Sequence, residues 1–514
     1  MSGVKFGLKR DTCHLTQLMP SLTSLSLTES QTLLQRGEIS SRELVTACLE
    51  HVSALDGQLH AFLYVAAEQA LAQAEAADKK LSELRGTGLP ISQSTMPLLG
   101  IPMAIKDVLT VEGMPCTCGS KILEGYVPPF TATVVQKLQA AGVIVIGKTN
   151  TDEFAMGSST ENSAYGVTHN PWDVARVPGG SSGGSAAAVV AGLVPAALGT
   201  DTGGSVRQPA SFCGVTGIKP TYGRSSRYGL VAYGSSLDCV GAFGHSAADV
   251  AAVFSAYNGR DPLDATTQDV PAANITLGTE AVSSLKGIRI GVPKEYFIAG
   301  IQPEVEGKIR AAIQKMEELG AEIRQVSLPH TEYALPVYYL IAPAEASANL
   351  ARFDGVRYGP RVSGDSMWDV FYKTRGEKFG DEVTRRIMLG TYALSAGYYD
   401  AFYGQAQKVR TLIKRDFEQV FHEVDAVACP VAPTTAFKIG AHGDDPLAMY
   451  LEDVFTLPAN LAGVPGLAFP VGFDAAGLPV GMQLMGRHFD EAMLFRVAHA
   501  YQQATDWHKQ KPTL

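Results

Sequence analysis

Two segments rich in glycine and serine contain the residues that could perform nucleophilic chemistry. Residues 179–185 read Gly-Gly-Ser-Ser-Gly-Gly-Ser, and residues 201–208 read Asp-Thr-Gly-Gly-Ser-Val-Arg-Gln. The two glycines before Ser205 let the backbone bend so that consecutive N–H groups point into one small space, as an oxyanion requires. Ser205 would then be a nucleophile with its own anion site. Alternatively, Gly-Gly-Ser is only a turn that precedes a helix.

A serine nucleophile needs a base that removes its proton, and the sequence indicates no histidine for that role. Residues 101–105, Ile-Pro-Met-Ala-Ile, favour a buried strand that ends at Lys106. Burial disfavours the charged form of a lysine and lowers its pKa, so a neutral Lys106 could be the base. Alternatively, Lys106 and Asp107 form an ion pair at a solvated strand end.

Two further motif matches fail the test of their context. Residues 142–149, Gly-Val-Ile-Val-Ile-Gly-Lys-Thr, fit the phosphate-loop pattern, but Val-Ile-Val-Ile favours a buried strand over a flexible loop. A nucleotide-binding module therefore stays a less favoured hypothesis. Residues 179–183 and 180–184 fit GxSxG, the nucleophile elbow, which must directly follow a strand. Residues 170–178 contain two prolines and do not resemble a strand, so a Ser-His-Asp hydrolase is disfavoured.

Capping signals and hydrophobic patterns predict the elements that position these residues. Ser26 and Ser40 each begin a Ser-x-x-Glu capping box, and residues 66–85 form a third helical pattern. Later, short β-branched runs alternate with helical patterns. The predicted strand–helix–strand units comprise residues 101–109, 131–141 and 143–146, and then residues 288–292, 303–319 and 321–328.

This alternation predicts an α/β fold with a mixed, mostly parallel β-sheet that helices cover on both faces. We expect a single large domain over residues 26–514, because no long Pro- or Ser-rich linker interrupts it. Residues 1–25 are expected to be a poorly ordered extension.

Composition limits the functional classes. The chain has 514 residues, with 42 Lys and Arg against 51 Asp and Glu, which gives a net charge of −9. This net charge argues against broad binding of a nucleic-acid backbone by this chain alone, because such binding depends on clustered cations. Any nucleic acid would be held by a partner.

Cysteine usage and hydropathy indicate a cytoplasmic protein. The seven cysteines show no CxxC pair, so we predict no metal site. Residues 178–200 are uncharged but consist mainly of Gly, Ser and Ala with Pro195 inside, so no membrane association is predicted. The basic, hydroxyl-rich start leaves an organellar location open, should residues 1–25 act as a transit peptide.

Together these segments resemble the amidase signature family. Its hallmark Gly/Ser-rich stretch is matched by residues 179–185 and 201–205, and residues 100–107 match its lysine segment. The resemblance implies a triad of Ser205 as nucleophile, Ser181 as the serine that follows a cis peptide bond, and Lys106 as base. It also implies the amidase signature fold. One departure is Gly-Ala-Phe-Gly-His at residues 241–245, where a Gly-Pro-Phe-x-Arg segment is expected.

The resemblance is strongest to family members that hydrolyse glutamine for a tRNA-dependent amidotransferase. It implies that backbone N–H groups of Thr202, Gly203, Gly204 and Ser205 hold the oxyanion while a glutamyl ester forms. By the same resemblance, Arg386 binds the α-carboxylate of glutamine, Asp453 its α-ammonium, and Tyr338 lines the pocket. From the residues alone, the interpretation of Arg386 and Asp453 as surface residues beside Arg385 and Glu452 is favoured.

Partners are implied in the same way. The ammonia would convert Glu-tRNA(Gln) to Gln-tRNA(Gln) in a complex in which a B subunit binds the tRNA and uses ATP and Mg, and a small C subunit stabilises the pair. This chain itself would need no cofactor. A stand-alone amidase acting on another amide stays open as the alternative, as do asparagine as donor and Asp-tRNA(Asn) as acceptor.

Overall fold

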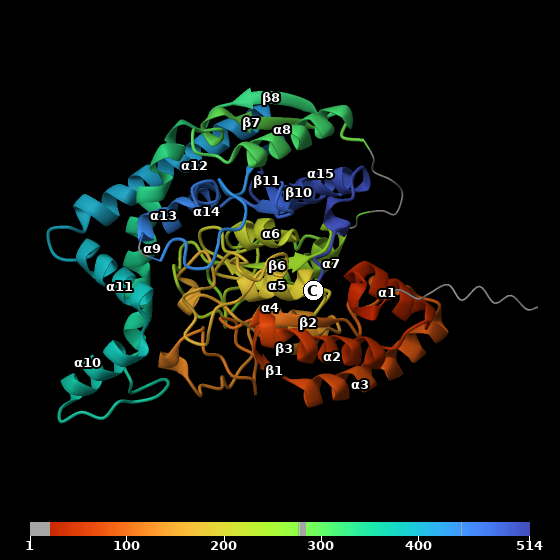
Figure 1. Ribbon diagram of the computed structural model, residues 1–514, viewed down its shortest axis with the longest axis horizontal. Helices are drawn as coiled ribbons and strands as arrows, with labels where there is room; N and C mark the ends of the chain where they lie inside the picture. Colours follow the sequence, from red (N-terminus) through yellow and green to blue (C-terminus); the bar gives the residue numbers. More distant parts are fainter. Residues whose placement is uncertain (1–20, 276, 278–283, 444) are drawn as a thin grey trace, which may run out of the picture.

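The computed structural model describes residues 21–275, 277, 284–443 and 445–514, and within them a sheet of eleven strands crosses the whole body (Figure 1). The strands follow the order β1-β3-β2-β4-β6-β5-β10-β11-β9-β7-β8. Their bounds are β1 Phe62–Val65, β2 Pro102–Lys106, β3 Ile144–Thr149, β4 Ala196–Asp201, β5 Thr216–Lys219, β6 Cys239–Gly244, β7 Arg289–Pro293, β8 Glu322–Val326, β9 Ala426–Pro430, β10 Gly466–Phe473 and β11 Pro479–Gly486.

Fifteen α-helices in the described residues surround this sheet. They are α1 Leu27–Arg36, α2 Ser41–Leu59, α3 Ala67–Thr87, α4 Thr133–Ala140, α5 Gly183–Val190, α6 Arg207–Cys213, α7 Ala247–Tyr257, α8 Pro303–Glu318, α9 Ala334–Asn349, α10 Met367–Lys378, α11 Asp381–Ala393, α12 Gln405–Glu423, α13 Pro446–Leu451, α14 Leu457–Ala462 and α15 Glu491–Gln503. Every residue of β2, β4, β6 and β11 is buried. Because successive strand side chains point to opposite faces, both faces of the sheet are covered.

The capping boxes begin helices where the sequence predicts them. Ser26 and Ser40 each accept a hydrogen bond from the backbone N–H three residues later, and Glu29 and Glu43 bond back. Figure 1 shows α1, α2 and α3 together at the lower right, beside β1, β2 and β3. Of the predicted extension, residues 1–25, the first twenty lie outside the described residues. Leu25 is described and is buried against the body.

Parallel pairing is confirmed in the two predicted strand–helix–strand units but is less extensive than expected. β2 pairs in parallel with β3 and β4, and β7 pairs in parallel with β8 and β9. Between these wings, neighbours from β4 to β9 pair antiparallel. The two central connections that join paired neighbours directly, β5 to β6 and β10 to β11, lack the crossover helix that a parallel pair requires, so the strands run antiparallel.

The parallel strands β3, β2 and β4 bring three loops to one edge of the sheet. Lys106 is the last residue of β2 and pairs with Thr149 at the end of β3. β4, on the other side of β2, ends at Asp201. Ligand and active sites of such sheets form beyond the carboxyl ends of parallel strands. The fold therefore places the lysine segment and the second Gly/Ser-rich segment side by side.

The hydrophobic phosphate-loop match is a strand, as the sequence predicts. Residues 144–149 form β3 and are fully buried. Lys148 donates to the Asp107 carboxylate over 2.7 Å and to the carbonyl oxygen of Pro115 over 3.2 Å. None of the helices in the described ranges is long and apolar enough to span a membrane.

The close packing of α9 on α11 gives a test of the fold. A Cβ atom on Gly390 of α11 would lie 1.9 Å from the carbonyl oxygen of Pro343 in α9. Gly390→Ala is therefore expected to lower the free energy of unfolding by about 1 to 3 kcal/mol, although alanine favours helix elsewhere. Gly376→Ala on α10, where a Cβ meets nothing within 4 Å, is the matched control and is expected to raise it by up to about 1 kcal/mol. Urea denaturation measures both, and effects of the same sign would contradict the packing.

Candidate active site

Lys106 is buried at the carboxyl end of β2 and contacts three hydroxyl groups. Its Nζ donates to Ser181 Oγ over 2.6 Å, to Ser182 Oγ over 2.8 Å and to Thr200 Oγ1 over 2.9 Å. The side chain has no solvent exposure, so the alternative of a solvated ion pair with Asp107 is wrong. Asp107 instead pairs with Lys148.

Burial lowers the pKa of Lys106 to about 7, although the carboxylates of Asp152, Asp201 and Asp238 oppose the shift. Hydroxyl groups can accept a hydrogen bond from an ammonium and can also donate one to a neutral amine. Near neutral pH, this arrangement therefore holds a substantial fraction of neutral amine against Ser181.

The loop that carries Ser181 lies directly before α5, and a cis peptide bond joins Gly180 to Ser181. Hydrogen bonds fix its backbone at the two residues before the serine. The N–H of Gly180 donates to Gln208 Oε1 over 2.9 Å, and Thr160 Oγ1 donates to the carbonyl oxygen of Gly179 over 2.8 Å. No strand immediately precedes this loop, which agrees with the sequence-based objection to a nucleophile elbow.

A backbone hydrogen bond joins the two Gly/Ser-rich segments. The N–H of Ser182 donates to the carbonyl oxygen of Ser205 over 3.2 Å, so Ser205 lies against the loop that Lys106 contacts. Ser205 is 8% exposed, whereas Ser181 and Lys106 have no exposure. Ser205 is therefore the member of this group that a substrate can reach.

A buried ion pair joins the two ends of the turn that contains Ser205. Arg207 Nε lies 3.1 Å from Asp201 Oδ2, and neither side chain is exposed. A Cβ on Gly204, whose φ is +146°, would lie 2.3 Å from Thr456 Oγ1, so this position requires glycine. Within the described part of the chain, the N–H groups of Gly203, Gly204 and Ser205 donate to no acceptor, which leaves them available to an anion.

Arg386 lies on α11 and is buried, so the alternative of a surface arginine is wrong. Its Nε donates to Glu382 over 2.7 Å and a terminal nitrogen donates to the Tyr233 hydroxyl over 2.6 Å. The rings of Tyr233, Tyr339 and Tyr450 lie 5.7, 5.3 and 5.3 Å from the guanidinium carbon. These contacts hold the guanidinium in one place.

Asp453 is also buried, and one of its oxygens is unsatisfied. Oδ2 accepts a hydrogen bond from the Ser158 hydroxyl, but Oδ1 has no partner among the described residues. Burial raises the pKa of Asp453 to about 7, against the opposing effects of Ser158 and Arg386. Oδ1 lies 3.3 Å from the Cβ position of Gly204, next to the turn before Ser205.

Tyr338, on α9, lies beside the same turn. Its hydroxyl lies 2.7 Å from the Cβ position of Gly203, and the side chain is buried. Of the three residues that the resemblance assigned to the substrate pocket, Tyr338 and Asp453 thus approach this turn, and Arg386 contacts Tyr233 from α11.

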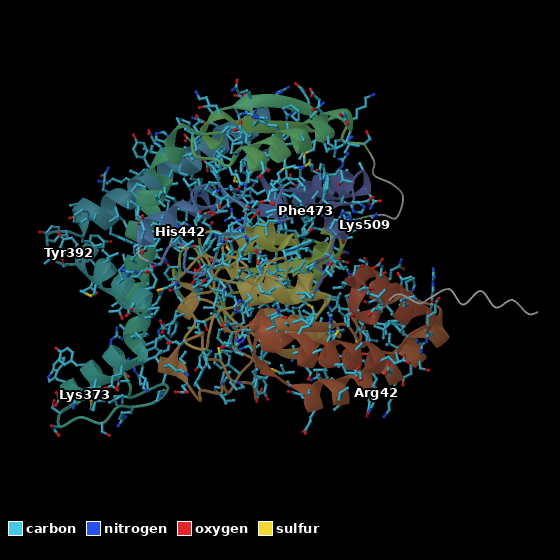
Figure 2. All side chains as sticks on the ribbon, in the orientation of Figure 1. Arg42, Lys373, Tyr392, His442, Phe473 and Lys509 are labelled. Atoms are coloured by element: carbon cyan, nitrogen blue, oxygen red, sulfur yellow. The ribbon has the colours of Figure 1, made fainter. Side chains whose placement is uncertain are left out.

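A cavity of about 230 Å³ opens beside Arg386. It is lined by Arg386 and Glu382 and by residues that approach from three segments: Gly157, Ser159, Glu161, Asn162, Asp381, Arg385, His442, Gly443, Pro446, Met449 and Tyr450. Figure 2 labels His442, which lies toward the α13 side of the body. The segments between α4 and α5 and around α13 therefore form the walls of this cavity together with α11.

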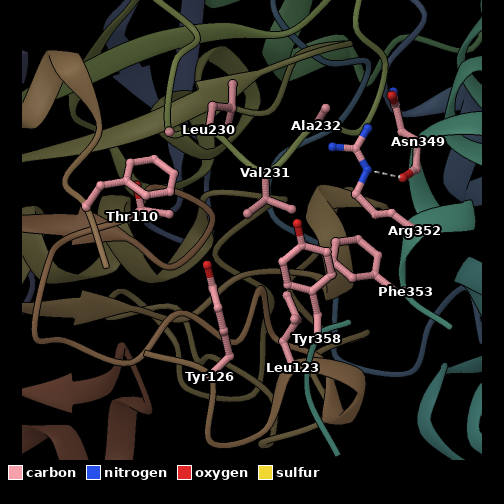
Figure 3. Close-up of a pocket in the computed structure, with 12 residues that line it drawn as sticks. Thr110, Leu123, Tyr126, Leu230, Val231, Ala232, Asn349, Arg352, Phe353 and Tyr358 are labelled. Atoms are coloured by element: carbon pink, nitrogen blue, oxygen red, sulfur yellow. Dashed lines mark hydrogen bonds between the residues drawn. The ribbon is translucent and has the colours of Figure 1, made fainter. Parts of the chain in front are cut away.

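A second cavity, of about 180 Å³, is separate from these residues. Figure 3 shows Tyr126, Phe353 and Tyr358 facing its interior while Arg352 donates to the carbonyl oxygen of Asn349. None of the residues that the sequence predicted for the active site lines it.

Several contacting residues were not predicted from sequence. Ser182 and Thr200 share the Lys106 ammonium, and Glu382 and Tyr233 hold Arg386. Ser182 is adjacent to Ser181 in a serine pair, which is a usable signal. The others follow from the packing of distant segments and have no local pattern. His245, at the departure from the family pattern, contacts none of the three triad residues within the described part of the chain, and no metal-holding group of three His, Cys, Asp or Glu occurs in the described ranges.

Known proteins resemble this chain in sequence and in fold. The family model described as Amidase matches residues 43–495. A relative from Roseiflexus sp. (strain RS-1), named as the A subunit of glutamyl-tRNA(Gln) amidotransferase, is 60% identical over 496 residues, which cover 96% of this chain and 99% of the relative. The crystal structure of the protein of that name from Thermotoga maritima is 42% identical, covers 96% of this chain and 97% of that one, and has a TM-score of 0.77. A peptide amidase in complex with the inhibitor chymostatin is 30% identical, with coverage of 95% and 99% and a TM-score of 0.79. The chain belongs to the amidase signature family.

Proposed function

We propose that this chain is the glutamine-hydrolysing subunit of a tRNA-dependent amidotransferase and releases ammonia through a glutamyl ester at Ser205. The observation that supports it best is that a buried amine bonded to Ser181 and the buried Oδ1 of Asp453, unpaired among the described residues, both lie beside the segment that carries Ser205. The relatives named as the A subunit of glutamyl-tRNA(Gln) amidotransferase support the same assignment.

Ser205 attacks the side-chain carbonyl of glutamine. Ser181 takes the proton of Ser205 as it passes its own to neutral Lys106, across the 2.6 Å contact. The proton returns by the same path to the leaving ammonia. Water then hydrolyses the ester and releases glutamate.

The negative charge that develops on the carbonyl oxygen is held by backbone N–H groups of residues 202–205. The unpaired N–H groups at Gly203 and Gly204 support this role, because preorganised donors stabilise an oxyanion without reorganisation. Thr456 donates to the carbonyl oxygen of Gly203 over 2.6 Å, which fixes the orientation of that peptide.

Recognition of glutamine requires a cation for its α-carboxylate and an anion for its α-ammonium. We assign Arg386 to the first and Asp453, with its unpaired Oδ1, to the second, and place Tyr338 in the wall of the pocket. An uncharged amide would leave Oδ1 of Asp453 without a partner, which disfavours the alternative of a stand-alone amidase.

The ammonia would be used by partner subunits. We propose a B subunit that binds Glu-tRNA(Gln), ATP and Mg and forms Gln-tRNA(Gln), and a small C subunit that stabilises the complex. The net charge of −9 supports this division, because this chain offers no general cationic surface for tRNA. We place the complex in the cytoplasm, unless residues 1–25 direct it to an organelle.

Removal of the nucleophile should separate the two half-reactions. Ser205→Ala is expected to lower glutamine hydrolysis at least about a thousandfold, because the ester can no longer form. Amidation driven by added ammonium should be retained in the assembled complex. Glutaminase and ammonium-dependent assays on the same preparation measure this, and loss of both activities in a correctly assembled complex would contradict the division.

The pH dependence should differ between glutamine and a neutral substrate. Lys106 must be neutral and Asp453 ionised, and each pKa is about 7, so both requirements are met as the pH rises through 7. Below pH 7, kcat/KM for glutamine should fall up to about a hundredfold per pH unit, since two protons are bound. Acylation by a small neutral ester, which needs only Lys106, should fall about tenfold per unit. Identical slopes would contradict the role of Asp453.

Substitution of the charged pair tests the substrate assignment. Arg386→Ala is expected to lower kcat/KM for glutamine by about 2 to 5 kcal/mol of transition-state stabilisation, and Asp453→Asn should act in the same direction. Arg385→Ala is the matched control, because its side chain lies half-exposed beside Arg386 and also contacts Glu382.

Acylation of Ser205 by the neutral ester should be retained in both variants. Equal losses on glutamine and on the ester would mean that these residues support the fold only. Full activity on glutamine would mean that the pocket is elsewhere.

A further inference from the structure

Asp152 is a buried carboxylate directly beneath the loop that carries Ser181, and neither the resemblance nor the proposed mechanism gives it a role. It lies three residues after the end of β3 and has no solvent exposure. Its backbone N–H donates to the carbonyl oxygen of Ser181 over 3.4 Å. A Cβ on Gly180 would lie 2.2 Å from Oδ2 of Asp152, so the loop rests on this carboxylate.

The carboxylate organises a clamp on both sides of Ser181. Oδ2 accepts the N–H of Thr160 over 2.9 Å, and Oδ1 accepts the N–H of Asn162 over 3.1 Å. Thr160 in turn donates its hydroxyl to the carbonyl oxygen of Gly179 and accepts the N–H of Gly183 over 3.1 Å. Asp152 therefore fixes, through Thr160, the residues that flank Ser181 and Ser182.

The charge of Asp152 also favours the charged form of Lys106. Three carboxylates act on the Lys106 ammonium, and two of them have a cation of their own. Asp201 pairs with Arg207 over 3.1 Å, and Asp238 lies 3.9 Å from Arg227. Asp152 forms no ion pair within the described ranges, so its charge is not neutralised by another side chain. The other titratable groups that face this pair are Glu161, on the side of Asp152, and Cys118, on the side of Lys106.

We propose that Asp152 is a positioning residue for this active site: it holds the Ser181 loop against β2 and keeps Lys106 basic enough to accept the serine proton. A buried ammonium without a nearby negative charge would become too weak a base. The inference rests on the proposed roles of Lys106 and Ser205. Burial raises the pKa of Asp152 to about 6, so the carboxylate is ionised in the pH range where Lys106 is neutral.

The test compares variants in the pH dependence of Ser205 acylation by a small neutral ester. Asp152→Asn removes the charge, and the acid limb of the profile should shift to lower pH by at least about half a unit, because the opposing carboxylate no longer favours the ammonium. The maximal rate should fall at least about tenfold, since the base is weaker and an amide N–H replaces one acceptor. Asp152→Ser, a smaller neutral variant, should show the same shift.

Two controls separate charge from structure. Glu153→Gln removes the neighbouring buried carboxylate, which bonds to Ser120 and Gly380 and not to the Ser181 loop. The acid limb of the pH profile of this variant should stay at the wild-type pH. Thr160→Val keeps the Asp152 charge but breaks the clamp, so it should lose at least about tenfold in rate without a shift.

Each outcome bears on the inference. An unshifted acid limb in folded Asp152→Asn or Asp152→Ser would overturn the proposed charge effect, and full activity in Thr160→Val would overturn the clamp. Should both neutral variants fail to fold, Thr160→Val still tests the clamp: a slower reaction at an unshifted pH supports the positioning role, and an unchanged rate overturns it. The Ser205→Ala variant tests the proposed function separately, because its loss of acylation does not depend on Asp152.

Discussion

Lys106 is fully buried, and its ammonium has hydroxyl groups as its only direct hydrogen-bond partners in the described part of the chain. A buried lysine with a carboxylate in contact would stay charged and could not accept a proton, as Lys148 on the neighbouring strand β3 illustrates. Burial there opposes the charge, but the contact with Asp107 still leaves the pKa of Lys148 above its usual value. The chemistry of the site therefore depends on carboxylates that are near Lys106 but not in contact with it.

The order of the strands in the sheet brings the parts of this site together. β2 is flanked by parallel neighbours, so its last residue, the loop after β3 and the turn after β4 meet at one edge. The second Gly/Ser-rich segment follows β4 directly, whereas the first reaches Lys106 after the long segment 150–178. The residues that we propose for recognition, Arg386 and Asp453, lie on segments that follow the second parallel unit in the chain, and Asp453 lies beside the turn after β4.

Local sequence patterns predicted the elements and the reactive residues, but not their surroundings. The capping boxes predicted the starts of α1 and α2. At β3 the run Val-Ile-Val-Ile predicted a buried strand correctly although the segment matches the phosphate-loop pattern, because a hydrophobic run is a stronger structural signal than a short motif. The antiparallel centre was underestimated because short strands such as β5 and β6 carry little periodic signal. Glu382 and Asp152 gained meaning only from tertiary contacts, which no spacing along the chain encodes.

The central claim is that the Lys106 amine titrates near neutral pH. The most direct measurement is the NMR titration of lysine labelled at the side-chain nitrogen, with the Lys106 signal assigned by its absence from a Lys106→Arg variant. We predict that this signal changes protonation near pH 7, well below the ordinary lysine value of 10.5. A Lys106 signal that remained that of an ammonium up to pH 10 would contradict the claim, because Ser181 would then have no base to receive its proton.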